Sequence, residues 1–552
     1  MVVLVAIGLL VFLQYQYVLY LSYIMDEFVD SSLGGDMFLR VRPYVDYFPF
    51  KTQLGVLLYG LPYLFCRNME AILLINRHTA FLFVILSLYL LFRLHRSVFD
   101  SMHGGLWAVF WTLACSTFIE HSATIRVDIM ATCLALLAVY LMVILRPGVR
   151  ALAAGICLGI AFCTTQKSIY FILPFMLSFW LLRRKAGFRA IREFALFAVG
   201  GLAVFAAYLV GFGHGGAYVN VLQDTFNPQR AVSLTVVREF YQDLPNFHWQ
   251  TFSRNISFYC LSFLGLAYVL RLWRTSTWQQ EFVACFTLGV VALLLIHRHS
   301  WPYVFMFGIP FLGLFAAVLS DLVYEALRDT PRLLAVPALI LLVGVGINTV
   351  QRYRIYSTAQ ALEQMPTVRA AEAILGPEDT YFDGVRMIGT RTPASWLFLD
   401  AETMDRVREN WGTEKVELLH ALRTARCKLI IHNYRLESLP PEFRTFLRRH
   451  YVLIDRNILV SGAAITKSPY VGELIWPGPY GLVPKGDCRN IRIDDQPVGA
   501  SSGTLTLSEG DHRVTYEGNG GLLLIPASAQ KWIRDNPVQP RVTWLFLDLY
   551  KL

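Results

Sequence analysis

Long apolar segments dominate the first 350 residues of this chain, and they restrict its fold more than any other feature. A helix needs about 20 predominantly apolar residues to cross the hydrocarbon core of a bilayer. Eleven segments meet or approach that length, at residues 2–23, 71–92, 104–119, 128–145, 151–164, 169–182, 194–212, 256–270, 282–296, 302–323 and 333–349. We therefore expect a polytopic α-helical membrane protein with about eleven transmembrane helices.

The distribution of charge supports this expectation and sets an orientation. Only 16% of the residues are charged, against about a quarter in soluble proteins. Short loops on one side are densely basic, as cytoplasmic loops are; they hold Arg93, Arg96, Arg146, Arg150, Arg183, Arg184, Lys185, Arg189, Arg192, Arg271, Arg274, Arg328 and Arg332. These loops account for much of the net charge of +9, so we expect membrane lipids and no nucleic acid as partners.

The opposite side is then extracytoplasmic. It holds the loops 24–70, 120–127, 165–168, 213–255 and 297–301, together with everything after about residue 350. This arrangement is typical of a multi-pass protein of the cell (inner) membrane whose larger loops face the periplasm.

The last 200 or so residues differ in composition from the rest, because they are rich in Asp, Glu, Arg, Gly and Pro and contain no apolar run of spanning length. We expect a transmembrane domain at 1–350, a soluble extracytoplasmic α/β domain at 351–487, and a small β-rich, sandwich-like module at 488–552. Cys427 and Cys488 are the two cysteines in this part. A disulfide between them is compatible with an oxidising compartment, but the sequence leaves the pairing open.

Two adjacent carboxylates, Asp26 and Glu27, follow the first apolar segment directly. A desolvated carboxylate at a membrane boundary can act as a general base or bind a cation. The same pair can also simply mark the end of a helix at the water interface.

Basic residues stand in the next two outer loops. Arg126 and Asp128 lie where the fourth predicted helix re-enters the membrane, and Lys167 follows Gln166 between two short segments. Arg126 is suited to bind a phosphate, with Asp128 orienting it, and a lone lysine at this depth needs an anionic partner. Alternatively, Arg126 pairs with Asp128 and Lys167 extends to the membrane surface.

The last short outer loop reads His297-Arg298-His299-Ser300-Trp301-Pro302-Tyr303. Arginine can grip a phosphate with two hydrogen bonds, and aromatic rings can stack on the apolar faces of sugars. A plain interfacial anchor would use the same residue types.

These clusters share one membrane face, and their residues resemble the GT-C superfamily of integral-membrane glycosyltransferases. The resemblance is greatest to the bacterial branch related to protein O-mannosyltransferases and aminoarabinose transferases. It covers roughly residues 15–310 and is carried by Asp26-Glu27, Tyr44-Val45-Asp46-Tyr47 with Pro49, Arg126-Val127-Asp128, Thr165-Gln166-Lys167 and His299-Ser300-Trp301-Pro302-Tyr303.

The resemblance implies an inverting transfer of a sugar from a polyprenyl-phosphate-linked donor to an acceptor hydroxyl on a lipid, glycan or protein. It implies that Asp26 or Glu27 assists the hydroxyl, and that Asp46, or else Asp36, is the second acidic residue of the first loop. Arg126, Lys167 and Arg298 would neutralise the lipid phosphate; the supporting residues would be Asp128, Gln166, His299, Trp301 and Tyr303. Related enzymes occur both with and without a divalent metal, and the sequence does not decide between them.

Two other classes of protein remain open. A lipid-linked saccharide flippase or transporter would also have many spans and charged residues, but it should show repeat symmetry or paired broken helices, and the sequence shows neither. A receptor or scaffold would act through its C-terminal domain, and the charged residues at the helix ends would then be incidental.

Overall fold

Helices occupy the apolar part of the chain as expected. The computed structural model describes residues 2–38, 41–47, 49, 51–183, 188–226, 247–296, 301–327, 346, 350, 361–399, 403–404, 407, 411–498 and 504–546. Ten of the eleven expected membrane segments fall in this part, and each of the ten is helical. The eleventh, at 333–349, lies outside the described residues apart from Gly346.

Six described helices are long and apolar enough to cross a membrane. They are α1 (Val2–Tyr20), α4 (Met69–Phe99), α7 (Val127–Ile144), α10 (Phe188–Phe212), α15 (Trp278–Ile296) and α16 (Ile309–Leu327). A seventh candidate is the pair α5 (Met102–Ala114) and α6 (Ser116–Ser122), which is bent by 73°. The shorter apolar helices α8 (Val149–Thr164), α9 (Ile169–Arg183) and α14 (Ile256–Arg271) complete the ten segments. The protein is therefore a multi-pass membrane protein.

Glycines allow several of these helices to approach closely. A Cβ atom at Gly155 of α8 would collide with the Phe197 carbonyl of α10, and one at Gly265 of α14 would collide with the Phe315 carbonyl of α16. Small residues at such crossings let helix backbones pack without intervening side chains. Large apolar side chains such as Leu202 point outward instead, as expected for a surface that faces lipid.

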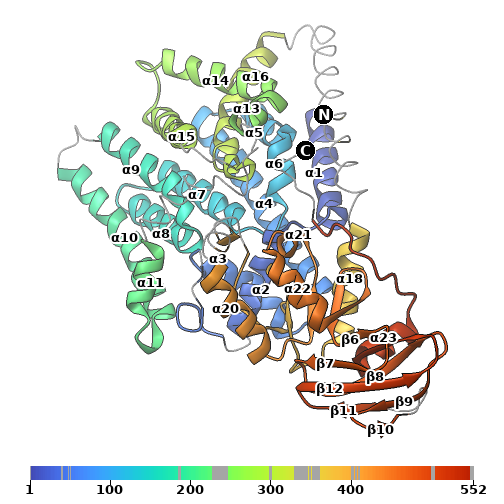
Figure 1. The fold of residues 1–552 in the computed structure, drawn as a ribbon. Helices are drawn as coiled ribbons and strands as arrows, with labels where there is room; N and C mark the ends of the chain where they lie inside the picture. Colours follow the sequence, from blue (N-terminus) through green and yellow to red (C-terminus); the bar gives the residue numbers. More distant parts are fainter. Residues whose placement is uncertain are drawn as a thin grey trace.

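Short helices form a layer at one end of the bundle, next to the C-terminal domain (Figure 1). This layer contains α2 (Met25–Phe38), α3 (Leu54–Gly60) and the 3-10 turns η1 (Leu61–Leu64), η2 (Gln166–Ser168) and η5 (Pro302–Phe307). Farther along the chain, η4 (His214–Gly216) and α11 (Tyr218–Thr225) follow α10, and α13 (Phe247–Arg254) precedes α14. The outer loops expected to carry the site thus fold into short helices.

An α/β layer follows helix α18 (Ala361–Ile374). Its five-stranded sheet has the order β2-β1-β3-β5-β4, with β1 (Thr380–Phe382), β2 (Thr392–Pro393), β3 (Leu429–Ile431), β4 (Tyr451–Asp455) and β5 (Ile458–Ser461). Strand β1 pairs in parallel with β2 and β3, whereas β5 is antiparallel to β3 and β4. The accompanying helices are α20 (Trp411–Thr424), α21 (Tyr434–Glu437) and α22 (Pro441–His450).

Two four-stranded sheets form a β-sandwich after the α/β layer (Figure 1). Their orders are β10-β9-β12-β7 and β11-β8-β13-β6, with β6 (Ala463–Ile465), β7 (Tyr470–Leu474), β8 (Gly478–Lys485), β9 (Arg489–Ile493), β10 (Gln496–Pro497), β11 (Leu505–Leu507), β12 (Gly510–Glu517), β13 (Gly521–Pro526) and the helix α23 (Ala527–Asp535). The expected fold class, a helical membrane domain with a soluble α/β and sandwich-like C-terminal part, is confirmed.

The domain limits proposed at 350 and 487 stay predictions, although position 488 lies between β8 and β9, inside the sandwich. Cys427 and Cys488 are not joined by a disulfide: the thiol of Cys427 donates to the Leu429 carbonyl and that of Cys488 to the Gly521 carbonyl.

The C-terminal domain is packed directly against the membrane domain. One apolar cluster contains Phe28 of α2 and Tyr59 of α3 together with Val368, Ile388 and Ile431 of the C-terminal domain. A shared core of this kind fixes the orientation of α2, the helix that carries Asp26 and Glu27.

Candidate active site

Glu27 is completely buried and fully hydrogen-bonded. Its two oxygens accept from Arg77 Nε and Nη2, both at 2.8 Å. They also accept from the backbone N–H of Ile24 at 2.9 Å and of Ile125 at 3.1 Å. The carboxylate therefore joins the start of α2 to α4 and to the loop that leads into Arg126.

Arg77 anchors this arrangement from the interior of the bundle. Its guanidinium donates to the carbonyl oxygens of Val18, Leu21 and Ser22 at 2.6–3.3 Å and lies 3.7 Å from the ring centre of Tyr23. The end of α1 leaves carbonyl groups without intrahelical partners, and Arg77 satisfies them.

Asp26 faces the opposite way, toward Arg126. Arg126 Nη1 donates to Asp26 Oδ2, while Arg126 Nε donates to Asp128 Oδ2 at 3.1 Å. Lys167 Nζ donates to the other oxygen of Asp128 at 3.3 Å. Asp26 and Lys167 remain 35% and 34% exposed, whereas Arg126 and Asp128 are buried. These four side chains alternate in charge, with the accessible carboxylate of Asp26 at one end and the accessible ammonium group of Lys167 at the other.

The ring of Tyr303, in η5, lies against both cations of this chain. Its centre is 3.5 Å from the Arg126 guanidinium carbon and 4.4 Å from Lys167 Nζ. A cation close to an aromatic face is attracted by the quadrupole of the ring. Tyr303 therefore holds the two cations side by side.

A second ion pair lies one helical turn along α2. Lys51 donates to Asp30, and Asp30 is four residues after Asp26, so both carboxylates project from the same face of the helix. We define the charge cluster as Asp26, Asp30, Lys51, Arg126, Asp128 and Lys167. It contains three carboxylates and three cations.

Comparisons with known proteins agree with this architecture. Residues 58–210 match the family model for dolichyl-phosphate-mannose-protein mannosyltransferase. The structure resembles ArnT from Cupriavidus metallidurans in the apo state, with a TM-score of 0.56 and 12% identity over 83% of this chain and 97% of that one.

The same ArnT bound to undecaprenyl phosphate gives a TM-score of 0.52 and 14% identity, again over 83% of this chain and 97% of that one. The chain therefore shares the fold of these ArnT structures, and about a quarter of it matches the mannosyltransferase family model.

A further solved relative has the same fold. The oligosaccharyltransferase AglB from Archaeoglobus fulgidus, in complex with an inhibitory peptide and a dolichol-phosphate, aligns with a TM-score of 0.51 and 11% identity over 84% of this chain and 73% of that one. No curated protein sequence matches the chain. The region matched by the family model contains Arg126, Asp128 and Lys167 but begins after Asp26.

The structure places the residues expected to support the site as follows. Gln166 Oε1 accepts from the backbone N–H of Thr52 at 3.2 Å, which ties η2 to the loop that carries Lys51. Trp301 packs on Phe247, with 5.2 Å between ring centres. Arg298 and His299 lie outside the described residues.

The two candidates for a second acidic residue in the first loop do not join the charge cluster. Asp46 is partly exposed and pairs with Arg42 four residues before it. Asp36 is buried and pairs with Arg386 of the C-terminal domain. Asp30, which we did not single out from the sequence, is the second acid on the Asp26 face of α2.

The electrostatics of α2 separate the two aspartates. Burial alone would raise the pKa of Asp26, but Arg126 and Lys51 reverse this and hold the pKa below its ordinary value. The pKa of Asp30 is raised instead, because burial outweighs the effect of Lys51. The pKa values of the two aspartates are therefore shifted in opposite directions.

A metal centre was left open by the sequence. Among the described residues, no three His, Cys, Asp or Glu side chains are grouped closely enough to hold an ion. Arg126 stands between Asp26 and Asp128, and Lys51 is bound to Asp30. The described carboxylates of the charge cluster are thus engaged in ion pairs with these cations.

Proposed function

We propose that the protein transfers a sugar from a polyprenyl-phosphate-linked donor to an acceptor hydroxyl at the extracytoplasmic face of the membrane, with inversion. The observation that carries this proposal is the pairing of an accessible carboxylate, Asp26, with a buried guanidinium, Arg126. The first suits an acceptor hydroxyl and the second a lipid phosphate.

Asp26 is the carboxylate we propose as the base. Glu27 is fully buried and already accepts four hydrogen bonds, so it has no oxygen available to a substrate. Asp26 would accept the proton of the acceptor hydroxyl as the acceptor oxygen attacks the anomeric carbon. The bond from that carbon to the phosphate oxygen breaks, and polyprenyl phosphate leaves with the electron pair.

Arg126 and Lys167 are the groups we propose for the donor phosphate, with Arg298 as a further candidate. The described cluster is electrically balanced before a donor arrives, with three acids and three cations. A phosphate that contacts Arg126 would compete with Asp26 for this guanidinium. Asp26 would then lose part of its ion pair and become more basic when the donor is in place.

Neutralising the leaving phosphate is the larger catalytic contribution in this proposal. Charge develops on the phosphate oxygen as the sugar departs, and fixed cations in a water-poor site stabilise that charge strongly. Arg126 is fixed by Asp128 and Tyr303, so little reorganisation is needed during the reaction.

The cellular placement follows the basic loops. We propose the inner membrane, with the charge cluster and the C-terminal domain on the periplasmic side. Two solved relatives support a lipid-phosphate ligand, because they are bound to undecaprenyl phosphate and to a dolichol-phosphate. The acceptor is proposed only as a hydroxyl of a lipid, glycan or protein.

A direct test uses purified protein in nanodiscs with radiolabelled polyprenyl-phosphate sugars. The proposal expects release of polyprenyl phosphate that requires Asp26. The competing function is a flippase, and it expects movement of lipid-linked sugar between the leaflets of liposomes without release. Scrambling with every donor intact would overturn the transferase proposal.

A further inference from the structure

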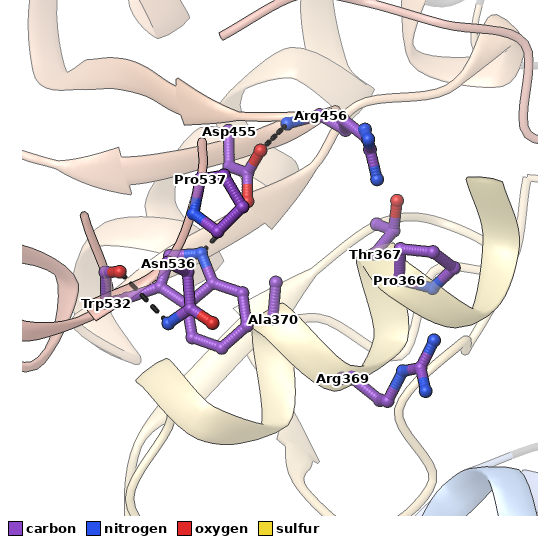
Figure 2. A pocket seen from close by; sticks show the side chains of 9 residues that line it. All are labelled: Pro366, Thr367, Arg369, Ala370, Asp455, Arg456, Trp532, Asn536 and Pro537. Atoms are coloured by element: carbon purple, nitrogen blue, oxygen red, sulfur yellow. Dashed lines mark hydrogen bonds between the residues drawn. The ribbon is translucent and has the colours of Figure 1, made fainter. Parts of the chain in front are cut away.

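A cavity lies in the C-terminal domain between α18 and α23, away from the charge cluster (Figure 2). Its volume of about 310 Å³ is near the lower end of the range for small-molecule sites. Arg369 and Thr367 line it from α18, Arg456 from the turn after β4, and Trp532 and Asn536 from α23 and the residue that follows it. A space of this size suits one sugar ring with a substituent.

The lining carries positive charge. Its one carboxylate, Asp455, is occupied by the protein itself, since Oδ1 accepts from the backbone N–H groups of Arg456 and Gln539 at 2.8 and 3.0 Å. Oδ2 accepts from Trp532 Nε1 at 2.9 Å. Asp455 therefore orients the indole, and the guanidinium groups of Arg369 and Arg456 favour an anion.

Arg369 is held only weakly by its own partner. It lies 3.8 Å from Glu70, and both side chains are about half exposed, at 56% and 42%. Exposed pairs of this kind contribute little free energy. A phosphate, which arginine can bind with two parallel hydrogen bonds, would replace this contact readily.

The same pair locates the cavity relative to the membrane. Glu70 is the second residue of α4, so Arg369 lies where this spanning helix leaves the bundle on the side of the C-terminal domain. Anionic head groups of lipids occupy that level of a bilayer. Near the end of a spanning helix, a phosphate could come from a lipid head group or from a soluble glycan.

The first turns of α18 also contact the start of the candidate active site. Gln364 accepts from the backbone N–H of Tyr23 at 2.9 Å and donates to its carbonyl at 2.7 Å. Tyr23 lies three residues before Asp26. Gln364 precedes Thr367 of the cavity lining by three residues, about one helical turn, so the same part of α18 contacts both the cavity and the α1–α2 junction.

We propose that this cavity binds the phosphate of a phosphorylated saccharide, and that this saccharide is the polar head of the acceptor; the acceptor role rests on the proposed function. The phosphate lies between Arg369 and Arg456. The sugar ring packs against the apolar face of the Trp532 indole. Its hydroxyl groups lie within reach of Asn536. The anchored head keeps its extension close to Asp26.

The binding test uses the full-length protein in nanodiscs of neutral lipid, titrated by calorimetry with glucose 6-phosphate, glucose and inorganic phosphate. We expect glucose 6-phosphate to bind most tightly, and the double variant Arg369→Gln/Arg456→Gln to lose about tenfold or more in affinity, as for a lost charge-assisted hydrogen bond. Arg369→Lys/Arg456→Lys should retain part of the affinity. The matched control is Arg426→Gln, an exposed arginine of the same domain that pairs with Glu509, and it should bind like the wild type.

Equal binding of glucose 6-phosphate by the double glutamine variant and the wild type would overturn the site. Equal affinity for inorganic phosphate and glucose 6-phosphate would overturn its saccharide specificity. Neutral nanodiscs doped with a phosphoglycolipid distinguish a lipid source from a soluble one: selective binding of the phosphoglycolipid over phosphatidylglycerol supports the proposal, and equal binding contradicts it. Hydrolysis of the donor, in which water attacks the anomeric carbon in place of the acceptor hydroxyl and polyprenyl phosphate leaves, should be the same in the double variant and the wild type. Loss of saccharide binding and loss of the proposed function can therefore be told apart.

Discussion

Arg386 Nη2 donates to both carboxylate oxygens of Asp36, at 2.7 and 2.6 Å, across the junction between the C-terminal domain and α2. The loop that presents Arg386 is shaped by Asp383, whose carboxylate accepts three successive backbone N–H groups, those of Val385, Arg386 and Met387. Both charged side chains are almost fully buried. The C-terminal domain therefore holds the helix that carries Asp26.

Removing one partner of this pair should destabilise the protein strongly. Arg386→Met leaves Asp36 buried without a counter-ion, a change that typically costs about 3–5 kcal/mol. We expect a clear fall in thermal stability, measured by loss of the monodisperse peak after heating. The double variant Asp36→Asn/Arg386→Met should recover part of it, because no charge is left unpaired.

The exposed pair Arg423–Glu473 in the same domain supplies the control, since breaking such a pair costs about 1 kcal/mol or less. If the thermal stability falls no more in Arg386→Met than in Arg423→Met, the ion pair between Asp36 and Arg386 does not hold the junction.

Glu27 should behave as a structural residue. Glu27→Gln removes the charge that balances buried Arg77, so we expect a loss of stability of about 3–5 kcal/mol. Arg77→Met should give a similar loss, and the double variant less than the sum, because the two residues form one unit. The measurement is a double-variant cycle on the melting temperature. Additive losses in this cycle would contradict the assigned pairing.

The acid limb of the pH–rate profile should reflect the ion pair of Asp26. Burial acts to raise its pKa, but Arg126 and Lys51 lower it below the ordinary value of 3.8. A lowered pKa keeps the carboxylate ionised above that value, so the stability and activity it supplies are present at neutral pH and are lost only as the pH falls through the lowered pKa.

Replacing the main cation tests this assignment. In Arg126→Gln the residual activity should decline at a higher pH than in the wild type, because the pKa of Asp26 rises when the guanidinium is removed. The pH dependence of kcat/KM for the donor measures the shift, because kcat/KM reports the pKa of the donor-free protein. An acid limb at the same pH in both proteins would mean that the titrating group is not Asp26.

Tyr303 should contribute through its ring. Tyr303→Leu removes an aromatic face that contacts Arg126 and Lys167, and such contacts are worth about 0.5–2 kcal/mol. We expect donor affinity to fall roughly two- to thirtyfold, as these energies imply. Tyr303→Phe keeps the ring and should bind the donor as the wild type does. Loss of affinity in both variants would instead assign the effect to the hydroxyl.

Much of the candidate site can be predicted from the sequence, because the alternation of loops places Asp26, Arg126, Lys167 and Tyr303 on one face of the membrane. Asp30 of the cluster and the neighbouring Arg77 each have a sequence signal that we did not use. Asp30 follows Asp26 at helical spacing, and Arg77 interrupts an apolar segment, where an unpaired charge is costly and so indicates a partner.

Other features of the site depend on tertiary contacts that no local pattern encodes. Asp36 and Asp46 both lie in the loop that follows the first apolar segment, yet one pairs with Arg386, 350 residues away, and the other with Arg42, four residues before it. The different partners of Asp26 and Glu27 likewise depend on the position of Arg77, since adjacent residues on a helix point in different directions.

The measurement that tests the account most directly compares Asp26→Asn with the wild type in two assays, donor binding and release of polyprenyl phosphate with acceptor present. Asparagine has nearly the shape of aspartate but cannot take up the acceptor proton. General-base catalysis contributes about 10²–10⁴-fold, so we predict that release falls by this factor. The donor should bind at least as tightly as in the wild type, because a neutral amide competes less with the phosphate for Arg126. Near-normal release by Asp26→Asn would contradict the assignment of Asp26 as the base.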